Sequence, residues 1–471
     1  MTEPQDHAAG GEQEGLFGHL LDSRVLGSLF ASQELRAAFA DRATLQSWLD
    51  VEVALVQAQA EMGLVPEDAA RQIEAGACAD DWDLDAMSGE IQRTGHPLVP
   101  AIRELTARAG SAGAWVHLGA TTQDIMDTGL VLQCRRALDL VDLRLDRLVE
   151  TLLGLAQRYR DLPMMGRTHA QHALPITLGF KFAVLLAETD RHRERLQAAR
   201  SRVLVGQLGG AVGSLASFGP RGPEVVSRTM ARLGLPAPHI SWHTARDGLT
   251  ELVCVLSMVS ATCGKIANEI RVLQRTEVSE LEEPFSPGRI GSSTMPHKRN
   301  PMFAEFIISN AIITRSAPTQ MLTAMLQEHE RDMTMWGVEW AVVPETFVLT
   351  GGLLERADQL LDGLVVHEDA IRRNLHQLGD LVLSEAAMMH LASRLGKDEA
   401  HEVVYQASMQ AWDTKRTLRE CLLDVPAVAA ATDAATLDAL LTPESYLGSC
   451  QVLVDDVVKH VLSRAESSHV G

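Results

Sequence analysis

Apolar residues recur every three or four positions along several long stretches of the chain. The clearest stretch runs from Leu130 to Tyr159, where charged residues fall on the other faces. Its apolar positions are Cys134, Leu138, Val141, Leu145, Leu148, Leu152 and Leu155. This pattern predicts a helix of about eight turns. Helices of this length are much longer than average and are typical of bundles.

Similar patterns follow elsewhere, and no alternating strand pattern of comparable strength appears. They cover Ser32 to Met62, Leu178 to Val203, Leu249 to Thr276 and Pro301 to Met325. Because aromatic residues make up only 4% of the chain, Leu, Ala, Val and Met must fill the interior, which also favours helix. We therefore predict an all-α subunit with a long central helical bundle.

Two interruptions and a change of pattern divide the chain. Residues 206–223 contain too much glycine to continue a helix, so they predict a crossing between two helices. Residues 282–301 are rich in Pro, Gly and Ser, so they predict a long loop that joins two long helices. Long loops in a compact domain are often active-site lids. The predicted units are a disordered tail (1–15), an N-terminal helical domain (16–116), a central bundle with the 282–301 loop (117–366) and a C-terminal helical domain (367–471).

Charge and cysteine usage narrow the classes of function. The formal net charge of -20 argues against a nucleic-acid partner, because phosphate binding needs a basic surface. A small anionic substrate would need a local positive pocket. The six cysteines are scattered without C-x-x-C spacing, which predicts free thiols rather than disulfides or a metal site. No stretch suggests a membrane span, and residues 1–15 lack a signal peptide's apolar core, so we expect a cytoplasmic protein.

The segment from Gly291 to Pro301 (GSSTMPHKRNP) carries the strongest chemical signal. It places hydroxyls, an ammonium, a guanidinium and an amide in a loop framed by glycine and proline. These groups can hold a carboxylate and stabilise negative charge that grows on it. Composition alone favours the plainer interpretation of a solvated basic loop.

The same segment resembles the signature G-S-S-x-x-P-x-K-x-N-P of the fumarase/aspartase superfamily. Its ending resembles the adenylosuccinate lyase and carboxymuconate cycloisomerase branches. The resemblance implies that Ser292 is the general base and that Lys298 and Asn300 contact the substrate. A serine needs backbone donors and neighbouring cations to act as a base, and the loop supplies the cations.

A second segment, Gly119 to Asp124 (GATTQD), resembles the superfamily's first carboxylate-binding loop. In that loop paired hydroxyls and an amide grip one carboxylate, which implies substrate contacts from Thr121, Thr122 and Gln123. Alone the segment would be weak, because hydroxyls before a long helix often serve as caps.

A third segment, Gly166 to His172 (GRTHAQH), resembles the second such loop, so the three segments follow in the expected order. This resemblance implies that Thr168 and His169 lie beside the leaving group. Imidazole titrates near neutrality, so His169 suits the acid that protonates a basic leaving group. A purely structural role is the alternative for a histidine near a helix start.

Overall the chain is most similar to the carboxymuconate cycloisomerase branch, and it departs from that branch at two histidines. His169 stands where the branch carries tryptophan, and His96, in Gly95-His96-Pro97, stands where it carries Gly-Asn. Both are histidines of the kind found in fumarate-releasing members, notably adenylosuccinate lyase, and the resemblance implies that His96 contacts the substrate. That lyase itself fits poorly, because residues 333–340 are largely apolar and lack its groups for a nucleotide phosphate.

Two arginines complete the implied substrate contacts. Arg315 matches a family arginine that binds the succinyl part of the substrate. Arg191 follows on the helix after His169 and could reach a second anionic group. The alternative for Arg191 is a surface ion pair on a long helix.

The resemblance implies a lyase that removes the proton next to a carboxylate and expels a group from the neighbouring carbon. The intermediate is a dianionic aci-carboxylate, with Thr121, Thr122, Lys298 and Asn300 as its stabilisers. We expect fumarate to be released from a small substituted succinate, and nitrosuccinate, which would release nitrite, is the leading named substrate. We expect no metal and no cofactor. Family members build each site from three subunits, which implies a homotetramer with shared sites.

Three alternatives remain open at this point. One is lactone-forming 3-carboxy-cis,cis-muconate cycloisomerisation, and another is an adenylosuccinate-type C–N lyase. The third belongs to a different class, a non-catalytic helical bundle like the lens crystallins derived from this superfamily. The presence of Ser292, Lys298, Asn300 and His169 argues against that third alternative.

Overall fold

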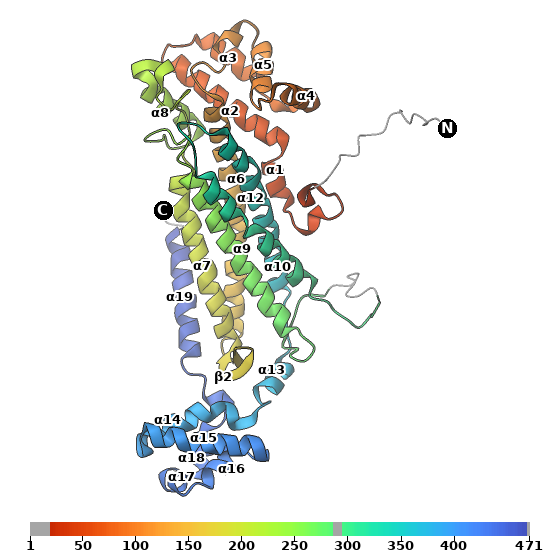
Figure 1. Cartoon of the computed structure of the whole chain (residues 1–471), viewed down its shortest axis with the longest axis vertical. Coiled ribbons are helices and arrows are strands. Elements are labelled where there is room, and N and C mark those ends of the chain that lie inside the picture. Colours follow the sequence, from red (N-terminus) through yellow and green to blue (C-terminus); the bar gives the residue numbers. More distant parts are fainter. Residues whose placement is uncertain (1–18, 286–293, 469–471) are drawn as a thin grey trace, which may run out of the picture.

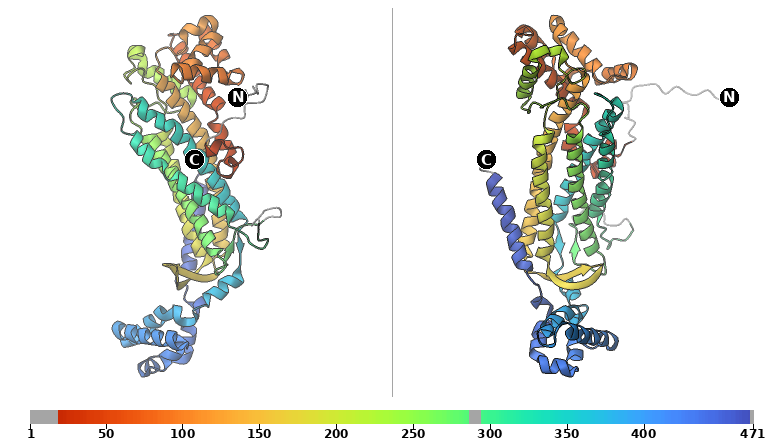
Figure 2. Two further views of the ribbon diagram at one scale, coloured as in Figure 1. Left: turned by 45° about the vertical axis from the view of Figure 1, so that its right-hand side comes forward. Right: turned by 60° about the vertical axis from the view of Figure 1, so that its left-hand side comes forward.

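The subunit is elongated in the computed structural model, which describes residues 19–285 and 294–468. Long helices form a central bundle, and groups of shorter helices lie at its two ends (Figures 1 and 2). Three clusters of buried apolar side chains underlie these parts. The predicted all-α class is confirmed, while the domain boundaries near residues 116 and 366 stay a prediction.

The central bundle consists of helices that run along the long axis of the subunit (Figure 1). They are α6 (Thr122–Arg158), α7 (Leu178–Val203), α9 (Asp247–Leu273), α10 (Met302–Thr314), α11 (Ala317–Ala324) and α12 (Met333–Asp362). Their inner faces bury Leu138, Leu256, Leu353 and many similar side chains in one cluster. With 37 residues at about 1.5 Å each, α6 spans roughly 55 Å.

The sequence pattern located most of these helices. The helix predicted over Leu178–Val203 has these bounds in the structure. The single helix expected from Pro301 to Met325 is instead two helices, α10 and α11, because the chain bends at Arg315 and Ser316. The pattern did not single out α12, since every residue from Thr346 to Leu354 is buried and no one-sided apolar stripe marks the helix.

Shorter helices cover the end of the bundle at which α6 begins (Figure 1). They are α2 (Asp41–Glu61), α3 (Glu67–Gly76), α4 (Leu84–Thr94), α5 (Val99–Arg108) and α8 (Gly222–Leu233), with the 3-10 turns η3 (Ala79–Asp81), η4 (Gly110–Trp115) and η5 (Ala216–Arg221). Before them, η1 (Leu20–Asp22), η2 (Gly27–Leu29) and α1 (Gln33–Ala38) contribute Leu21 and Leu35 to the central core. The predicted crossing over 206–223 is a loop that leads into η5 and α8.

The opposite end carries a separate group of helices (Figure 1). It contains α13 (Glu368–Leu375), η6 (Gly379–Leu383), α14 (Ser384–Leu395), α15 (Lys397–Thr414), α16 (Leu418–Leu423), α17 (Pro426–Ala431), α18 (Ala434–Leu440) and η7 (Pro443–Ser445). The last helix, α19 (Cys450–Ser468), returns along α7, and Val454 and Val461 join the central core. Within the predicted C-terminal unit of 367–471, α19 thus packs on the central bundle rather than on the shorter helices.

A β-hairpin closes this end of the bundle, and the sequence pattern missed it. β1 (Pro163–Thr168) pairs antiparallel with β2 (Gln171–Thr177) between α6 and α7. β1 buries three consecutive residues, so it lacks the alternation that marks a half-buried strand. A second antiparallel pair, β3 (Leu281–Glu282) with β4 (Val365–Val366), is only two residues long.

By length and composition alone, α9 could cross a membrane. The prediction that no stretch could span a membrane did not anticipate this property of α9. The position of α9 in the fold accounts for its composition, because 67% of its most apolar window is buried and it packs against α7, α10 and α12. An all-round apolar helix is expected at the centre of a large bundle.

Candidate active site

The first candidate segment lies where α6 begins. Thr121 is the N-cap of α6, and its N–H donates to Asp124 Oδ2 at 2.9 Å. Thr122, the first helical residue, places Oγ1 3.3 Å from His96 Nε2. Both threonines are half-buried, so their hydroxyls lie at the edge of the fold. Thr121 and Thr122 thus form one cluster with His96, which lies 25 residues or more before them in the sequence.

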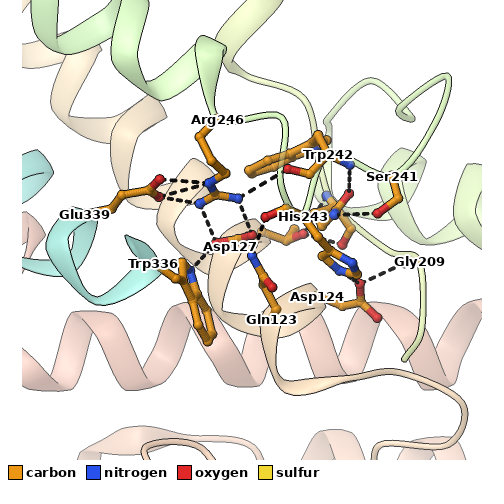
Figure 3. A network of polar contacts seen from close by, with 12 residues as sticks. Gln123, Asp124, Asp127, Gly209, Ser241, Trp242, His243, Arg246, Trp336 and Glu339 are labelled. Atoms are coloured by element: carbon orange, nitrogen blue, oxygen red, sulfur yellow. Dashed lines mark hydrogen bonds and ion pairs between the residues drawn. The ribbon is translucent and has the colours of Figure 1, made fainter. Parts of the chain in front are cut away.

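Asp124 fixes this cluster from beneath. Its carboxylate is completely buried and accepts the N–H groups of Gly209 at 2.7 Å and Gly210 at 2.9 Å, and it lies 2.8 Å from His243 Nε2 (Figure 3). The glycine-rich segment after α7 is therefore held against the start of α6. The spacing Thr-x-x-Asp is a capping-box signal that could have identified Asp124 from the sequence.

Gln123 belongs to this buried network. Its side chain is 1% exposed and donates to the His243 carbonyl at 2.9 Å (Figure 3). Beside it, Arg246 forms a bidentate ion pair with Asp127 at 2.7 and 3.0 Å and a second pair with Glu339. The family resemblance predicts that the Gln123 amide contacts the substrate beside Thr121 and Thr122. In the structure that amide instead points into the buried network.

Arg246 explains how this buried cluster is stabilised. Burial alone would lower the pKa of the guanidinium, but Asp127 and Glu339 raise it well above the ordinary value. Burial also raises the pKa of Glu339, although Arg246 opposes that shift. Trp336 donates its indole N–H to Asp127 at 2.9 Å, so α6, α9 and α12 are joined through one polar centre.

A second histidine lies close to the same loop. His117 Nδ1 is 2.6 Å from Glu52 Oε1, and Glu52 is only 2% exposed. Burial tends to lower the pKa of His117, but the hydrogen bond and charge of Glu52 outweigh it, so the pKa is raised. The sequence reading assigned no role to this pair, because 65 residues separate its members and no periodic pattern marks such a contact.

The second candidate segment is the tip of the β-hairpin. Thr168 ends β1, and both Thr168 and His169 are exposed. His169 and Ala170 have φ values of 50° and 61°, which is the backbone of a two-residue hairpin turn. Below the tip, Arg167 forms a bidentate ion pair with the buried Glu280 at 2.9 and 2.6 Å.

The third candidate segment is the loop after β3, of which Ser292 lies outside the described residues. Lys298 is exposed and Asn300 is half-buried. The base of the loop is tied together, because Arg299 Nη1 and His367 Nε2 lie 2.8 and 3.0 Å from the Glu282 carboxylate. Burial opposes their effect, but together they hold the pKa of Glu282 below its ordinary value.

The two predicted arginines lie on the outer surface of the bundle. Arg315 is the C-cap of α10, and Arg191 is on α7, and both are exposed. Neither contacts another candidate residue among the described parts of the chain. Both assignments stay predictions.

Within residues 19–285 and 294–468, one subunit does not bring the three segments together. Thr122 and Arg158 are the two ends of α6, roughly 54 Å apart, and the hairpin follows Arg158 directly. The hairpin and the base of the 282–301 loop share the far end, because Arg167 contacts Glu280 immediately before β3. Residues from a second copy of the chain would have to complete any site that uses all three segments.

A possible metal cluster elsewhere is better described as an ion-pair network. Within the described residues, ligand atoms of Asp190, Glu194 and His460 lie within 4.8 Å of one another. Arg193 already pairs with Asp190, and Arg464 with Glu194. The Arg464 contact joins α19 to α7.

Comparison with known proteins identifies the class. The family described as Lyase matches residues 30–313, and the family described as adenylosuccinate lyase C-terminus matches residues 380–457. The chain belongs to the Lyase family and to the adenylosuccinate lyase-like branch of the fumarase/aspartase superfamily. This membership confirms the family resemblance of the three segments.

Similar proteins include enzymes of two kinds. An N-acetyl-S-(2-succino)cysteine lyase from Dickeya dadantii (strain 3937) is 42% identical over 443 residues, which cover 94% of this chain and 97% of that protein. A 3-carboxy-cis,cis-muconate cycloisomerase from Pseudomonas aeruginosa is 42% identical over 437 residues, which cover 92% and 95%. The crystal structure of 3-carboxy-cis,cis-muconate lactonizing enzyme from Pseudomonas putida has a TM-score of 0.87 at 42% identity and covers 93% of this chain and 98% of that chain. The chain is therefore an enzyme of this superfamily, which sets aside the crystallin-like alternative.

Proposed function

We propose that this enzyme releases fumarate from a small 2-substituted succinate by β-elimination. The contact between His96 and Thr122 carries the proposal. It places one of the two histidines that separate the chain from the cycloisomerase branch directly on a predicted carboxylate-binding hydroxyl. His169, the other such histidine, is exposed on the hairpin tip, where it can meet a leaving group held at another subunit's surface.

The proposed reaction follows from these groups. Thr121 and Thr122 hold one carboxylate of the substrate, and Lys298 and Asn300 stabilise the charge of the aci-carboxylate. Ser292 takes the proton from the carbon next to that carboxylate. His169 then protonates a basic leaving group as its bond to the neighbouring carbon breaks, and fumarate is left.

Two leaving groups are supported by different observations. Nitrosuccinate, from which nitrite would leave, is the leading substrate on sequence grounds. The relative from Dickeya dadantii is named for N-acetyl-S-(2-succino)cysteine, from which a thiolate would leave. A cycloisomerase is the second candidate function, supported by the 42% identity to the Pseudomonas aeruginosa enzyme.

The test supplies these three compounds separately to the purified enzyme. Fumarate is followed by its absorbance, and conversion of 3-carboxy-cis,cis-muconate by loss of the diene and appearance of a lactone. Ser292→Ala serves as the matched control for contaminating activity. Fumarate from either succinate supports the proposal. A lactone from carboxymuconate without fumarate from either succinate would replace it with the cycloisomerase.

We also propose a homotetramer whose sites are shared between subunits. Exposed apolar side chains on the outer faces of α9, α10 and α11 support it, since such patches mark association surfaces. They include Met258 at 41% exposure, Ile312 at 55% and Leu322 at 57%. A stable and fully active monomer in light scattering would contradict this arrangement.

The remaining proposals concern environment and partners. The proposed ligands are small anionic dicarboxylates. The proposed reaction involves neither a nucleic acid nor a membrane. A cytoplasmic location is supported by the six cysteines, which are all free in the described chain. Cell fractionation with an antibody against the protein tests the location.

A further inference from the structure

His96 is held in a defined place between two helices. Gly95 ends α4 with φ 67°, in the left-handed region, and Pro97 follows His96 ahead of α5. The His96 ring then spans two groups. Nδ1 lies 3.2 Å from the Val99 backbone N, and Nε2 lies 3.3 Å from Thr122 Oγ1.

These two contacts determine which ring nitrogen carries the proton. The Val99 N–H can only donate, so Nδ1 must accept and cannot carry a proton in this arrangement. A neutral imidazole then has its proton on Nε2, and Nε2–H must donate to Thr122 Oγ1. Nε2 cannot also accept from Thr122, because a neutral imidazole has only one unprotonated nitrogen and here that nitrogen is Nδ1.

The direction of the Thr122 hydroxyl follows from this assignment. Its oxygen accepts from His96, so its own proton points elsewhere. Among residues 19–285 and 294–468, Thr122 Oγ1 forms no hydrogen bond besides the one with His96. A substrate carboxylate beside the start of α6 would find a donor that is already oriented, which is the arrangement that stabilises charge without reorganisation.

We propose that His96 is a positioning residue that acts through Thr122, by fixing the Thr122 hydroxyl proton toward the substrate carboxylate. This inference rests on the proposed function and deepens it. It differs from the sequence reading, in which His96 contacts the substrate directly. In this arrangement His96 is neutral and is a donor, so it neither pairs with a carboxylate as a cation nor protonates the leaving group.

Two variants separate the ring nitrogens. His96→Asn places an amide oxygen near the position of Nδ1, so it can still accept from the Val99 N–H but cannot reach Thr122. His96→Gln places an amide N–H near the position of Nε2, so it can still donate to Thr122 Oγ1. We expect His96→Asn to lower kcat/KM for fumarate release by at least about ten-fold, equivalent to about 1.4 kcal/mol. We expect His96→Gln to restore most of that loss.

The chain offers a matched control outside the site. His390 Nε2 lies 3.1 Å from Thr432 Oγ1 in the C-terminal helices, so it forms the same kind of contact. His390→Asn should leave kcat/KM unchanged. Thermal unfolding of all three variants shows whether a loss of activity reflects unfolding. If the role of His96 were merely structural, His96→Asn would be unstable and His96→Gln would not restore activity.

A double-mutant cycle with Thr122→Val provides the decisive measurement. If His96 acts through Thr122, His96→Asn should cause no further loss of kcat/KM in the Thr122→Val enzyme. Losses that multiply would mean that His96 touches the substrate itself, and the inference would be wrong. Fumarate binding by calorimetry completes the set. A wild-type enzyme that neither binds nor releases fumarate refutes the proposed function, whereas an active wild type with an unimpaired His96→Asn refutes the positioning role alone.

Discussion

Replacing Asp124 with asparagine should loosen the start of α6 and reduce activity through Thr121 and Thr122. The buried carboxylate has two faces. Oδ1 accepts from the Gly209 N–H at 2.7 Å and lies 2.8 Å from His243 Nε2. Oδ2 accepts from the N–H groups of Thr121 at 2.9 Å and Gly210 at 2.9 Å. The aspartate thus holds two loops together through one fully buried group.

The magnitude follows from what an amide can replace. Asparagine keeps one acceptor oxygen, but its NH₂ group must face donors on the other side. His243 can adapt by moving its proton to Nδ1, whereas the backbone N–H groups cannot. The least costly orientation therefore leaves the Gly209 N–H without an acceptor and removes the charge from the other contacts. Hydrogen bonds to charged groups contribute about 1.5–3 kcal/mol each, so we expect a loss of about 3 kcal/mol in unfolding free energy.

The assay is chemical denaturation of the assembled enzyme, together with kcat/KM for fumarate release. Asp433→Asn is the matched control, because Asp433 caps the exposed start of α18 and asparagine caps almost as well. We expect that control to lose well under about 1 kcal/mol. If Asp124→Asn were as stable as the control and fully active, the Asp124 network would not organise the carboxylate-binding loop.

Further predictions concern the three segments and the core. Ser292→Ala should assemble normally yet retain less than about a tenth of wild-type kcat, a barrier change above about 1.4 kcal/mol, in steady-state kinetics. His169→Ala should lower turnover by about a hundred-fold for a basic leaving group but by less for nitrite. Mixed tetramers of Thr122→Val and Lys298→Ala, each strongly impaired but still measurable alone, should regain up to about a quarter of the intact sites if these residues come from different subunits, whereas a site within one subunit would regain none. Burial lowers the pKa of His192 from 6.5 to about 4. The unfolding free energy should therefore fall by up to about 3 kcal/mol as the pH drops from 6.5 towards 4, because the unfolded chain binds the proton first. His192→Gln should flatten this part of the curve of unfolding free energy against pH, measured by chemical denaturation.

Long, one-sided helices were predictable because their burial pattern is local. The apolar positions of α6 and α7 face one core, so the three-to-four-residue spacing marks both helices in the sequence. The hairpin and α12 were not predictable in this way. β1 is buried by the bundle end and the C-terminal helices, and α12 by neighbours on several sides, so their burial depends on tertiary contacts that no short window contains.

The sequence motifs name candidate site residues but not their arrangement. The family resemblance assigns roles to Thr121, Thr122, His169 and Lys298, and these roles stay predictions. The motifs do not reveal that Gln123 faces inward, because a helix start presents one residue to solvent and the next to the core within a third of a turn. Contacts between distant segments, such as Glu52 with His117, leave no periodic trace at all.

The distance between the two ends of α6 links catalysis to assembly. The Thr122 end is fixed by a buried polar network, while the hairpin tip and Lys298 are exposed and have little to hold a substrate by themselves. In the proposed function, a carboxylate bound at one end therefore meets the proposed acid His169 and the proposed charge stabiliser Lys298 only when another copy presents them there. Dissociation of the subunits would separate these groups without disturbing the Asp124 network or the Arg167–Glu280 pair. Activity should consequently fall with dilution at the concentration where the oligomer dissociates, while the helical content of the subunit stays unchanged.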